Sequence, residues 1–254
     1  MALNQYNPYT LEGKTILITG ASSGIGAVTA VECSKMGANV IINGRNEQRL
    51  QETYNLLESN SCTQKHALLC ADLTNEEDLA SIINQIESID GLVNNAGVNR
   101  VKPVTFIQNE DMEFVFHNNT FASVNLTRLL LKKKKINKNS SIVFTSSVSA
   151  FYNAPGRALY AGSKAAITSF MRSFAVELAD KKIRANAVHP GMVETKMIRE
   201  NLTEEERQKD MLTYPLKRYG KPEEVAWAII YLLSDASAWV TGSSLTIDGG
   251  FLLK

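Results

Sequence analysis

Tyr160 and Lys164 have the spacing of neighbours on one helix face, which makes them a candidate pair for moving a proton. Side chains four residues apart lie side by side on a helix, and a nearby ammonium group favours tyrosinate and lowers the tyrosine pKa. A tyrosine in this setting can protonate a developing alkoxide when a ketone is reduced, and can act as a base in the reverse direction. Roughly 0.5 Tyr-Lys pairs with this spacing are expected by chance in a chain with 8 Tyr, so the surrounding sequence has to support the assignment.

A glycine-rich segment offers a place for the phosphates of a dinucleotide. It reads Thr-Gly-Ala-Ser-Ser-Gly-Ile-Gly over residues 19–26, and roughly 0.05 occurrences of its glycine spacing are expected by chance. Glycines let the backbone approach a pyrophosphate, and the amides and dipole at the start of a helix favour its charge. A tight strand-to-helix turn without a ligand is the alternative. The residues predicted to contact the cofactor here are Gly20, Ser22, Ser23, Gly24, Ile25 and Gly26.

The choice of cofactor depends on the residues after the second expected strand, Asn39–Ile42. Many NAD enzymes place an acid there, on the ribose of the adenosine. This chain continues with Asn43, Gly44 and Arg45 instead, and the Arg45 guanidinium could bind a 2′-phosphate through two hydrogen bonds. The pattern favours NADP(H) over NAD(H), with a solvated loop arginine as the alternative.

Two further segments are candidate contacts for the rest of the cofactor. Asp72 and the Leu73 backbone follow the third expected strand and could contact the adenine, although Asp72 also stands ahead of a helix and could cap it. The Asn-Asn-Ala-Gly run at residues 94–97 follows the fourth strand, where small side chains would let the cofactor lie against the backbone. An Asn-rich turn is the alternative. The contacts predicted in this run are Asn95, Ala96 and Gly97.

Short apolar runs alternate with longer helical patterns from residue 14 onward. Runs of this kind suit strands that are buried on both faces of a parallel sheet. The chain is therefore predicted to form one α/β domain over residues 1–254, a Rossmann-type doubly wound sheet of seven parallel strands with helices on both faces. The expected strands are Thr15–Thr19, Asn39–Ile42, Ala67–Cys70, Gly91–Val93, Ser141–Thr145, Arg184–Val188 and Ser244–Ile247. The expected helices cover residues 25–36, 46–59, 75–88, 109–135, 158–180 and 222–234.

Composition narrows the classes of protein. The 254 residues are 44% hydrophobic, enough for a sizeable core, and the formal net charge of +1 provides no field that would attract nucleic acid or an anionic membrane. The sequence shows no apolar leader and no run of eighteen apolar residues, so we expect a cytoplasmic protein without membrane segments. Cys33, Cys62 and Cys70 lack metal-ligand spacing, which predicts reduced thiols and no metal site.

These motifs, in this order, resemble the classical branch of the short-chain dehydrogenase/reductase family from Leu11 to Leu253. The family marks are the glycine turn, Asn-Asn-Ala-Gly, a serine thirteen positions before Tyr-x-x-x-Lys, and a later Pro-Gly. The resemblance implies a nicotinamide-dependent oxidoreductase that acts on CH-OH or C=O groups. The catalytic residues that it implies are Asn119, Ser147, Tyr160 and Lys164. The further cofactor contacts that it implies are Tyr160, Lys164, Pro190, Gly191, Val193 and Thr195.

The catalytic serine has a neighbour of the same type. Ser147 ends a strand and could hydrogen-bond the substrate carbonyl, which assists its polarisation. Ser146 stands beside it, but only Ser147 has the family's spacing to Tyr160. His189 precedes the Pro-Gly turn and is interpreted as structural, because Tyr160 can supply the proton.

The interpretation of Asn119 as a catalytic residue has two alternatives. By the resemblance it would order a water that relays protons to Lys164. The adjacent Asn118 could take that role instead, and a buried amide that bonds helix backbone is a further alternative.

Within the family, the pattern is most like that of the 3-oxoacyl-acyl-carrier-protein reductases, through residues 187–197 and 240–250. Similar segments recur in sugar, polyol and steroid dehydrogenases. Reduction of a 3-oxoacyl thioester is the favoured interpretation, and another small ketone or a non-catalytic cofactor-binding regulator is the alternative. Lys138 and Lys181 stand where the carrier reductases have basic residues, which predicts docking of an acyl carrier protein.

Two expectations concern the periphery of the site. The irregular stretch at residues 192–214 follows the sixth strand, where a substrate lid would lie, and a plain surface excursion is the alternative. The family usually forms tetramers through the helices expected at 109–135 and 158–180 and through the C-terminal strand, which implies a homotetramer.

Overall fold

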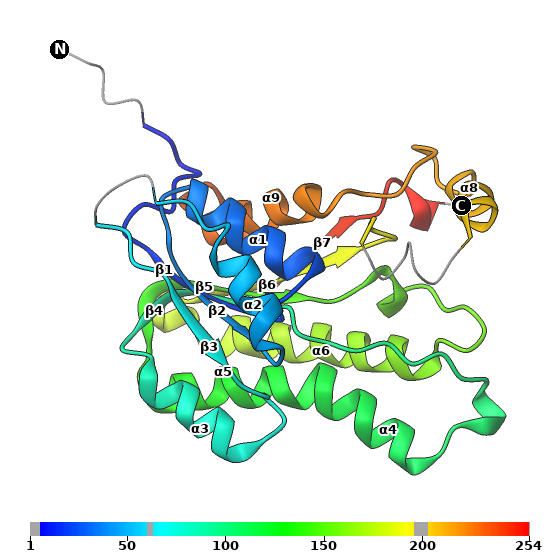
Figure 1. Cartoon of the computed structure of the whole chain (residues 1–254), viewed down its shortest axis with the longest axis horizontal. Helices are drawn as coiled ribbons and strands as arrows, with labels where there is room; N and C mark the ends of the chain where they lie inside the picture. Colours follow the sequence, from blue (N-terminus) through cyan, green and yellow to red (C-terminus); the bar gives the residue numbers. More distant parts are fainter. Residues whose placement is uncertain (1–5, 60–62, 196–202, 254) are drawn as a thin grey trace.

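The computed structural model describes residues 6–59, 63–195 and 203–253. Their apolar runs form one sheet of seven parallel strands, and helices cover both faces of it (Figure 1). The fold class expected from the sequence is confirmed. The strands in chain order are β1 Thr15–Thr19, β2 Asn39–Gly44, β3 Ala67–Cys70, β4 Ile89–Asn94, β5 Ile136–Thr145, β6 Arg184–Pro190 and β7 Ser244–Ile247.

The strand order is β3-β2-β1-β4-β5-β6-β7, so it reverses between β1 and β4. Leu17 of β1 marks this centre, since it lies in register with Ile41 of β2 and with Leu92 of β4. Ligands of doubly wound folds bind at such a switch point, outside the carboxyl ends of the strands. The topology therefore predicts where the site lies before any side chain is considered.

Two layers of helices enclose the sheet (Figure 1). One layer consists of α1 Gly24–Lys35, α2 Glu47–Tyr54 and α9 Pro222–Leu233. The other consists of α3 Glu76–Gln85, α4 Asn109–Phe116, α5 Ala122–Lys132 and α6 Ala158–Glu177. A separate hydrophobic cluster fills the space under each layer. Under the second layer, the fully buried Phe144 of β5 stacks on Phe174 of α6 with ring centroids 5.9 Å apart.

One expected helix is interrupted. Residues 109–135 form α4, a π-helical turn at His117–Phe121, and α5, which ends at Lys132. The turn contains Asn119, whose amide bonds groups outside its own helix. A polar side chain with such partners competes with a regular helical ladder, and single π-turns often mark functional sites. The apolar periodicity continues across the turn, so the sequence did not reveal it.

Two other boundaries differ most from those expected. Helix α2 ends at Tyr54, before the expected end at residue 59. Strand β5 begins at Ile136, ahead of the expected Ser141, and Ile136 pairs with Ile89 before the register shifts. Residues 137–139, just after Ile136, are polar and partly or fully exposed, so hydrophobic patterning alone misses the start of β5.

The stretch predicted as a lid, residues 192–214, contains regular structure. Near the start of this stretch, the Val193 backbone pairs with Gly220, and the stretch includes helix α8, Glu204–Met211. Thr203 starts α8 with a capping box, and acidic residues fill the first turn, as the helix dipole favours. Residues 196–202 of the predicted lid lie outside the described residues.

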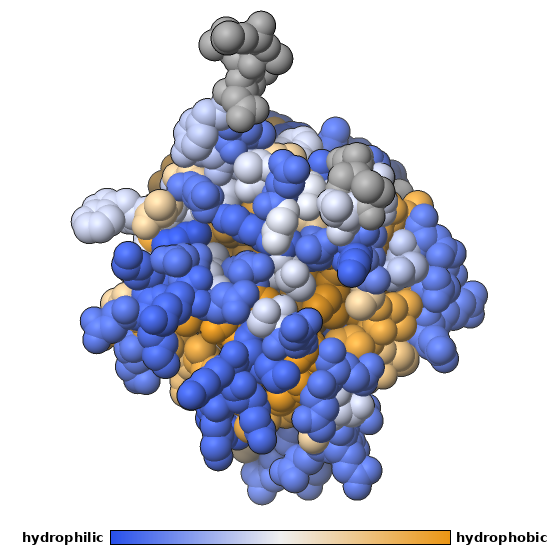
Figure 2. Space-filling model, turned by 90° about the vertical axis from the view of Figure 1, so that its left-hand side faces the viewer, coloured by the Kyte–Doolittle hydropathy of each residue, from blue (hydrophilic) through white to orange (hydrophobic). Residues whose placement is uncertain are grey.

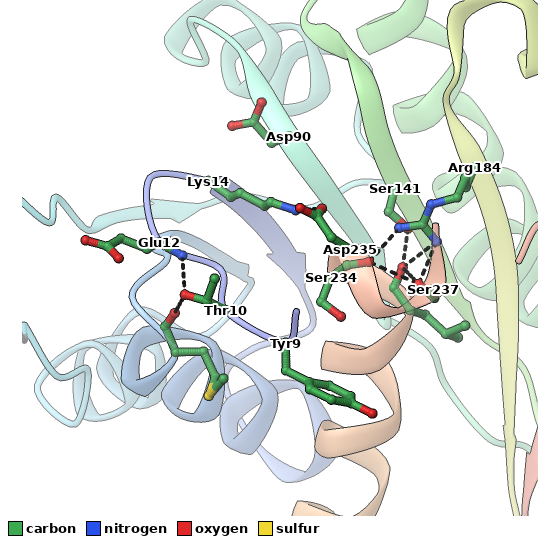
Figure 3. Close-up of polar contacts among 12 residues, drawn as sticks. Tyr9, Thr10, Glu12, Lys14, Asp90, Ser141, Arg184, Ser234, Asp235 and Ser237 are labelled. Atoms are coloured by element: carbon green, nitrogen blue, oxygen red, sulfur yellow. Dashed lines mark hydrogen bonds and ion pairs between the residues drawn. The ribbon is translucent and has the colours of Figure 1, made fainter. Parts of the chain in front are cut away.

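The amino-terminal edge of the sheet is held by polar contacts (Figure 3). Arg184, at the start of β6, donates to the Leu232 carbonyl at the end of α9 and to the Ser237 hydroxyl. Lys14 forms an ion pair with Asp235 at 2.6 Å. A cation there complements the negative end of the α9 dipole. Figure 2 views the molecule from this edge, where hydrophilic side chains surround apolar ones.

No helix of the described ranges is long and apolar enough to cross a bilayer.

Candidate active site

The predicted site segments meet at the carboxyl edge of the sheet. The glycine turn follows β1, Asn95 follows β4, Ser147 follows β5, and Pro190 is the last residue of β6. Parallel strands share one carboxyl edge, so segments that are far apart in the sequence become neighbours there. Helix α6 brings Tyr160 to the same edge, close enough to Ser147 for their side chains to hydrogen-bond.

Gly20 and the Asn-Asn-Ala-Gly segment fit together without room for a side chain. Gly20 has a φ of +65°, and a Cβ there would lie 2.8 Å from the Ala96 Cα. A Cβ on Gly26 would lie 2.5 Å from the Asn95 Nδ2. That same Nδ2 donates to the Gly20 carbonyl at 3.3 Å. The two motifs therefore form one packed unit, which requires glycine at both positions.

The Thr19 hydroxyl is a functional group that sequence reasoning passed over. It donates to the Val93 carbonyl at 3.2 Å and accepts from the backbone amides of Asn95 and Ala96 at 3.0 and 3.1 Å. Thr19 thus sets the direction in which the chain leaves β4. The threonine was part of the glycine motif, and its position at the switch point was the available signal.

The start of α1 suits a phosphate group. Ser23 is the N-cap of α1, yet its side chain makes no capping hydrogen bond. The first amides of a helix lack partners within it and favour an anion. A Cβ on Gly44 would lie 3.2 Å from the Ser22 Cβ, and one on Gly24 would lie 3.5 Å from the Thr195 Cγ2. Small residues and a helix start converge here, so the predicted dinucleotide contacts fit the local structure.

Arg45 follows β2 and has an exposed side chain. Its Nη1 lies 3.4 Å from the Asp72 Oδ2 and 3.4 Å from the Asn118 Oδ1. Burial acts to raise the pKa of Asp72, but hydrogen bonds from Thr74 and the charge of Arg45 outweigh it and hold that pKa below its usual range. Asp72 closes a turn through Thr74, whereas Asn75 is the N-cap of α3, so the alternative that Asp72 caps this helix is wrong. Its contact with a cofactor stays a prediction. The Leu73 side chain is buried, so only its backbone is available.

Ser146 and Ser147 have different partners. The Ser146 hydroxyl donates to the Lys164 carbonyl at 2.9 Å and lies 3.1 Å from the Thr168 hydroxyl, so it fastens β5 to α6. The Ser147 Oγ accepts from the Ser149 amide at 3.1 Å and keeps its hydrogen for another acceptor. This arrangement favours Ser147 as the residue that meets a substrate.

Tyr160 and Lys164 lie one turn apart on α6, as their spacing predicts. The Lys164 Nζ is 5.7 Å from the centre of the Tyr160 ring, and it donates to the Thr145 carbonyl at 2.8 Å. Lys164 is 3% exposed. Burial lowers the pKa of Lys164 to about 8.

Burial raises the pKa of Tyr160, and a hydrogen bond with Ser147 and the charge of Arg157 offset only part of the increase. This direction is opposite to the lowering that the Tyr-Lys spacing predicts. Lys164 does not produce the predicted lowering of the Tyr160 pKa, because its ammonium group lies over the Tyr160 ring and donates to the Thr145 carbonyl. Arg157 was not singled out in the sequence, and its position three residues before Tyr160 was the available signal.

Asn119 is fully buried and bonds two other segments. Its Oδ1 accepts from the Val98 amide at 2.6 Å, while its Nδ2 donates to the Val98 carbonyl at 3.0 Å and to the Ser163 Oγ at 2.9 Å. Both amide hydrogens are used, as the alternative of a buried amide predicts. A water would have to bond the remaining lone pair of Oδ1. The water-ordering role stays a prediction.

Gly97 lets two predicted catalytic residues come close to the backbone. A Cβ on Gly97 would lie 3.1 Å from the Asn119 Oδ1 and 3.4 Å from the Lys164 Nζ. Any larger residue would therefore press on both groups.

The turn after β6 is anchored to the end of β7. The Gly191 amide donates to the Ile247 carbonyl at 2.9 Å, and a Cβ on Gly191 would lie 3.0 Å from the Asp248 Cα. Val193 is buried and pairs with Gly220. Of the predicted contacts in this turn, the buried Val193 can offer mainly its backbone.

Lys138 and Lys181 lie away from these residues. Lys138 is the third residue of β5, and Lys181 ends a short helical turn, Ala179–Lys181, that precedes β6. Both residues are at the amino-terminal edge of the sheet, since Lys138 precedes Ser141, where the regular pairing of β5 begins, and the six residue steps from Ser141 to Ser147 span about 20 Å. Within one copy of the chain, they do not line the mouth of the site.

Comparisons with known proteins agree with this geometry. A family model described as enoyl-(acyl carrier protein) reductase matches residues 20–252. A 3-oxoacyl-[acyl-carrier-protein] reductase of Rickettsia bellii is 36% identical over 243 residues, 96% of this chain and 98% of that protein. One of Thermotoga maritima is 37% identical over 247 residues, 96% and 99% of the two chains. The solved structure of a 7α-hydroxysteroid dehydrogenase with NADH and 7-oxo glycochenodeoxycholic acid has a TM-score of 0.88 and 30% identity, covering 96% of this chain and 97% of that one.

Proposed function

The chain belongs to the short-chain dehydrogenase/reductase family and is an oxidoreductase, and we propose that it reduces a ketone to a secondary alcohol with NADP(H). The observation that carries this proposal is the meeting of Ser147, Tyr160 and Lys164 at the carboxyl edge of the sheet. A hydrogen-bond donor, a proton donor and a cation are the groups that the reduction of a carbonyl requires.

Each of these side chains has a role in the proposed reaction. The Ser147 hydroxyl donates to the substrate carbonyl oxygen and polarises the C=O bond. Tyr160, whose raised pKa keeps it protonated at neutral pH, gives its proton to that oxygen as negative charge develops there. The Lys164 ammonium stabilises the tyrosinate left behind, once it turns from the Thr145 carbonyl. Asn119 holds the backbone beside Lys164 through Val98.

The cofactor residues fit this reaction. NADPH, when bound, supplies the hydride that is added to the carbonyl carbon. The start of α1 at Gly24 would hold the pyrophosphate, Arg45 would bind the 2′-phosphate, and Lys164 would bond the nicotinamide ribose. The remaining proposed contacts are Gly20, Ser22, Ser23, Ile25, Gly26, Asp72, Leu73, Asn95, Ala96, Gly97, Tyr160, Pro190, Gly191, Val193 and Thr195.

We infer that the substrate is a 3-oxoacyl thioester, because 3-oxoacyl-[acyl-carrier-protein] reductases of Rickettsia bellii and Thermotoga maritima match this chain over nearly their whole length. A carrier protein bound at Lys138 and Lys181 would serve the site of a neighbouring copy, since both lysines lie at the far edge of their own sheet. A homotetramer would bring such copies together. Its contact surface would include the exposed aromatic rings of Phe121 and Phe170 on the outer helix layer.

A bulky apolar ketone is the second candidate. Phe151 and Tyr152, in the segment after Ser147, are about half exposed, and Tyr152 meets Phe251 edge to face at 5.1 Å between centroids. The Tyr214 ring also packs on Phe251, with ring centroids 5.0 Å apart. An aromatic rim of this kind favours a large apolar substrate. The likeness to the steroid dehydrogenase structure supports the same candidate.

A kinetic panel separates these candidates. NADPH oxidation is measured with an acetoacetyl thioester on acyl carrier protein, the same acyl group on a small thiol, a 7-oxo steroid, and a 2-enoyl thioester. Turnover of the carrier thioester with the highest kcat/KM supports 3-oxoacyl reduction, and preference for the steroid supports the second candidate. Binding of NADPH without turnover of any ketone would instead indicate a regulator.

A further inference from the structure

His189 joins the end of β6 to the turn that follows β5. It is fully buried, and its Nδ1 lies 3.1 Å from the Ser147 carbonyl oxygen. A carbonyl oxygen only accepts, so Nδ1 carries the hydrogen of this bond. The Ser147 carbonyl also accepts from the Ala150 amide at 3.0 Å. The Ser147 carbonyl therefore has one partner within the turn, the Ala150 amide, and one outside it, the His189 imidazole.

The His189 ring also supports the far end of that turn. Its centre lies 4.6 Å from the centre of the Phe151 ring, at an interplanar angle of 32°. Phe151 is bonded to the turn through its amide, which donates to the Val148 carbonyl at 2.9 Å. One side chain thus holds both ends of residues 147–151 against β6.

The second nitrogen and the protonation state of the His189 imidazole do not point to a role in proton transfer. No described residue bonds its buried Nε2. Burial lowers the pKa of His189, and the hydrogen bond to the Ser147 carbonyl offsets only part of this effect. The charges of Arg172 and Lys164 lower the pKa further, so the ring stays neutral with its hydrogen on Nδ1. Tyr160 is the group with a proton for the substrate, so a second acid is not needed.

The conformation of the turn decides where the Ser147 hydroxyl lies. The Ser147 Oγ accepts from the Ser149 amide at 3.1 Å, and this bond exists only while the turn is formed. A misplacement of about 1 Å in a reacting group can cost about 100-fold in rate.

We propose that His189 is a positioning residue for Ser147, which holds the Ser147 carbonyl through Nδ1–H and thereby directs the hydroxyl toward Tyr160. The effect on rate rests on the proposed function. The hold on the turn does not, and it can be measured separately.

Three substitutions of His189 test the position of the donor. His189→Asn keeps a donor near the place of Nδ1, His189→Gln moves it to the place of Nε2, and His189→Leu removes it. We expect His189→Leu to lower kcat about tenfold to 100-fold, since a misplaced hydroxyl acts only on the chemical step, and to leave the KM for NADPH unchanged. His189→Asn should recover most of kcat, and His189→Gln should not. Equal losses in the two amide variants would overturn the proposal, and this comparison remains available should His189→Leu fail to fold.

A double substitution shows whether His189 acts through Ser147. In a Ser147→Ala background, His189→Leu should cause little further loss of kcat, because the hydroxyl that it positions is gone. Losses that multiply in the double variant would overturn the proposal and indicate a general packing role. A Ser147→Ala variant with normal kcat would count against the proposed function instead.

Hydrogen exchange measures the hold on the turn without any turnover. The amides of residues 149–152 should exchange faster in His189→Leu than in the unsubstituted protein, and at the original rate in His189→Asn. Asn186→Leu is the matched control, since Asn186 is also buried in β6 but bonds the Val240 carbonyl and the Ser243 amide. Unchanged exchange in His189→Leu, or equal acceleration in the control, would overturn the proposal.

Discussion

Asn119 and Val98 hold each other through two opposed hydrogen bonds. The Val98 amide donates to the Asn119 Oδ1 at 2.6 Å, and the Asn119 Nδ2 donates to the Val98 carbonyl at 3.0 Å. This pairing resembles the two hydrogen bonds that residues on adjacent strands exchange, with the Asn119 side chain in place of the second backbone. It fixes the loop after β4 next to Lys164, and it coincides with the π-turn between α4 and α5.

Asn119→Ala should lower the free energy of unfolding by about 2–3 kcal/mol, because it leaves the Val98 amide and carbonyl without partners. Urea titration followed by circular dichroism measures this change. Asn118→Ala is the matched control and should cost less than about 1 kcal/mol, since the bonds of Asn118 to the Phe114 carbonyl and, weakly, to Arg45 are exposed to solvent. Similar decreases in the free energy of unfolding of both variants would show that the Asn119–Val98 hydrogen bonds do not contribute as proposed.

Tyr160→Phe should lower kcat at least about 100-fold, because only the proton donor is removed. Affinity for NADPH, measured by fluorescence titration, should stay nearly unchanged. Tyr231→Phe serves as the control, because Tyr231 packs on Tyr9 at the opposite edge of the sheet. Appreciable turnover by Tyr160→Phe would rule out the proposed proton donor.

Arg45→Asp should lower kcat/KM for NADPH about 10-fold to 100-fold, the equivalent of one charged hydrogen bond. The new carboxylate can accept from a ribose hydroxyl, so kcat/KM for NADH should rise. Arg49→Asp makes the same charge change in α2 and should leave the ratio of the two cofactors unaltered. A constant ratio in Arg45→Asp would show that another group selects the phosphate.

Lys164 should make stability depend on pH. Burial lowers its pKa to about 8, so below pH 8 both the folded and the unfolded chain carry its proton. Between pH 8 and the ordinary lysine value of about 10.4, the unfolded chain binds more protons, and stability due to this group rises with pH.

The measurement compares the protein with Lys164→Met across that range. The free energy of unfolding of the unsubstituted protein should rise relative to the variant by up to about 1.4 kcal/mol per pH unit. A difference that does not change between pH 8 and about 10 would contradict the lowered pKa.

Arg184→Met should lower the free energy of unfolding by about 2–4 kcal/mol, because several carbonyl groups at the end of α9 lose a charged donor (Figure 3). Lys14→Met, which removes the more exposed ion pair with Asp235, should cost less than about 1 kcal/mol. Neither change should alter kcat, since both residues lie at the amino-terminal edge. Equal losses of stability in the two variants, measured by thermal or urea unfolding, would contradict the expectation that the more buried Arg184 contributes more.

Much of the fold could be predicted from local patterns. The run Thr15–Thr19 is a strand with the predicted bounds, because a buried parallel strand leaves a continuous apolar run in the sequence. Ala67–Cys70 also has the predicted bounds, although it is a partly exposed strand at the edge of the sheet. The polar start of β5 and the π-turn at His117–Phe121 leave no such mark. Both depend on partners that are distant in the sequence.

The sequence by itself determined which residue types are present and how they are spaced: a glycine turn before a helix, a Tyr-Lys pair one turn apart, and an arginine where an acid would select NAD. These are local features, and spacing along the chain is enough to define them. Only the tertiary structure decided which groups they meet. It turned Ser146 toward α6 and left Ser147 at the site, and it directed Lys164 to the Thr145 carbonyl. It also removed Tyr160 partly from solvent, which raises the pKa of Tyr160. Burial and hydrogen-bond direction arise where strands and helices pack, and no periodicity in the chain encodes them.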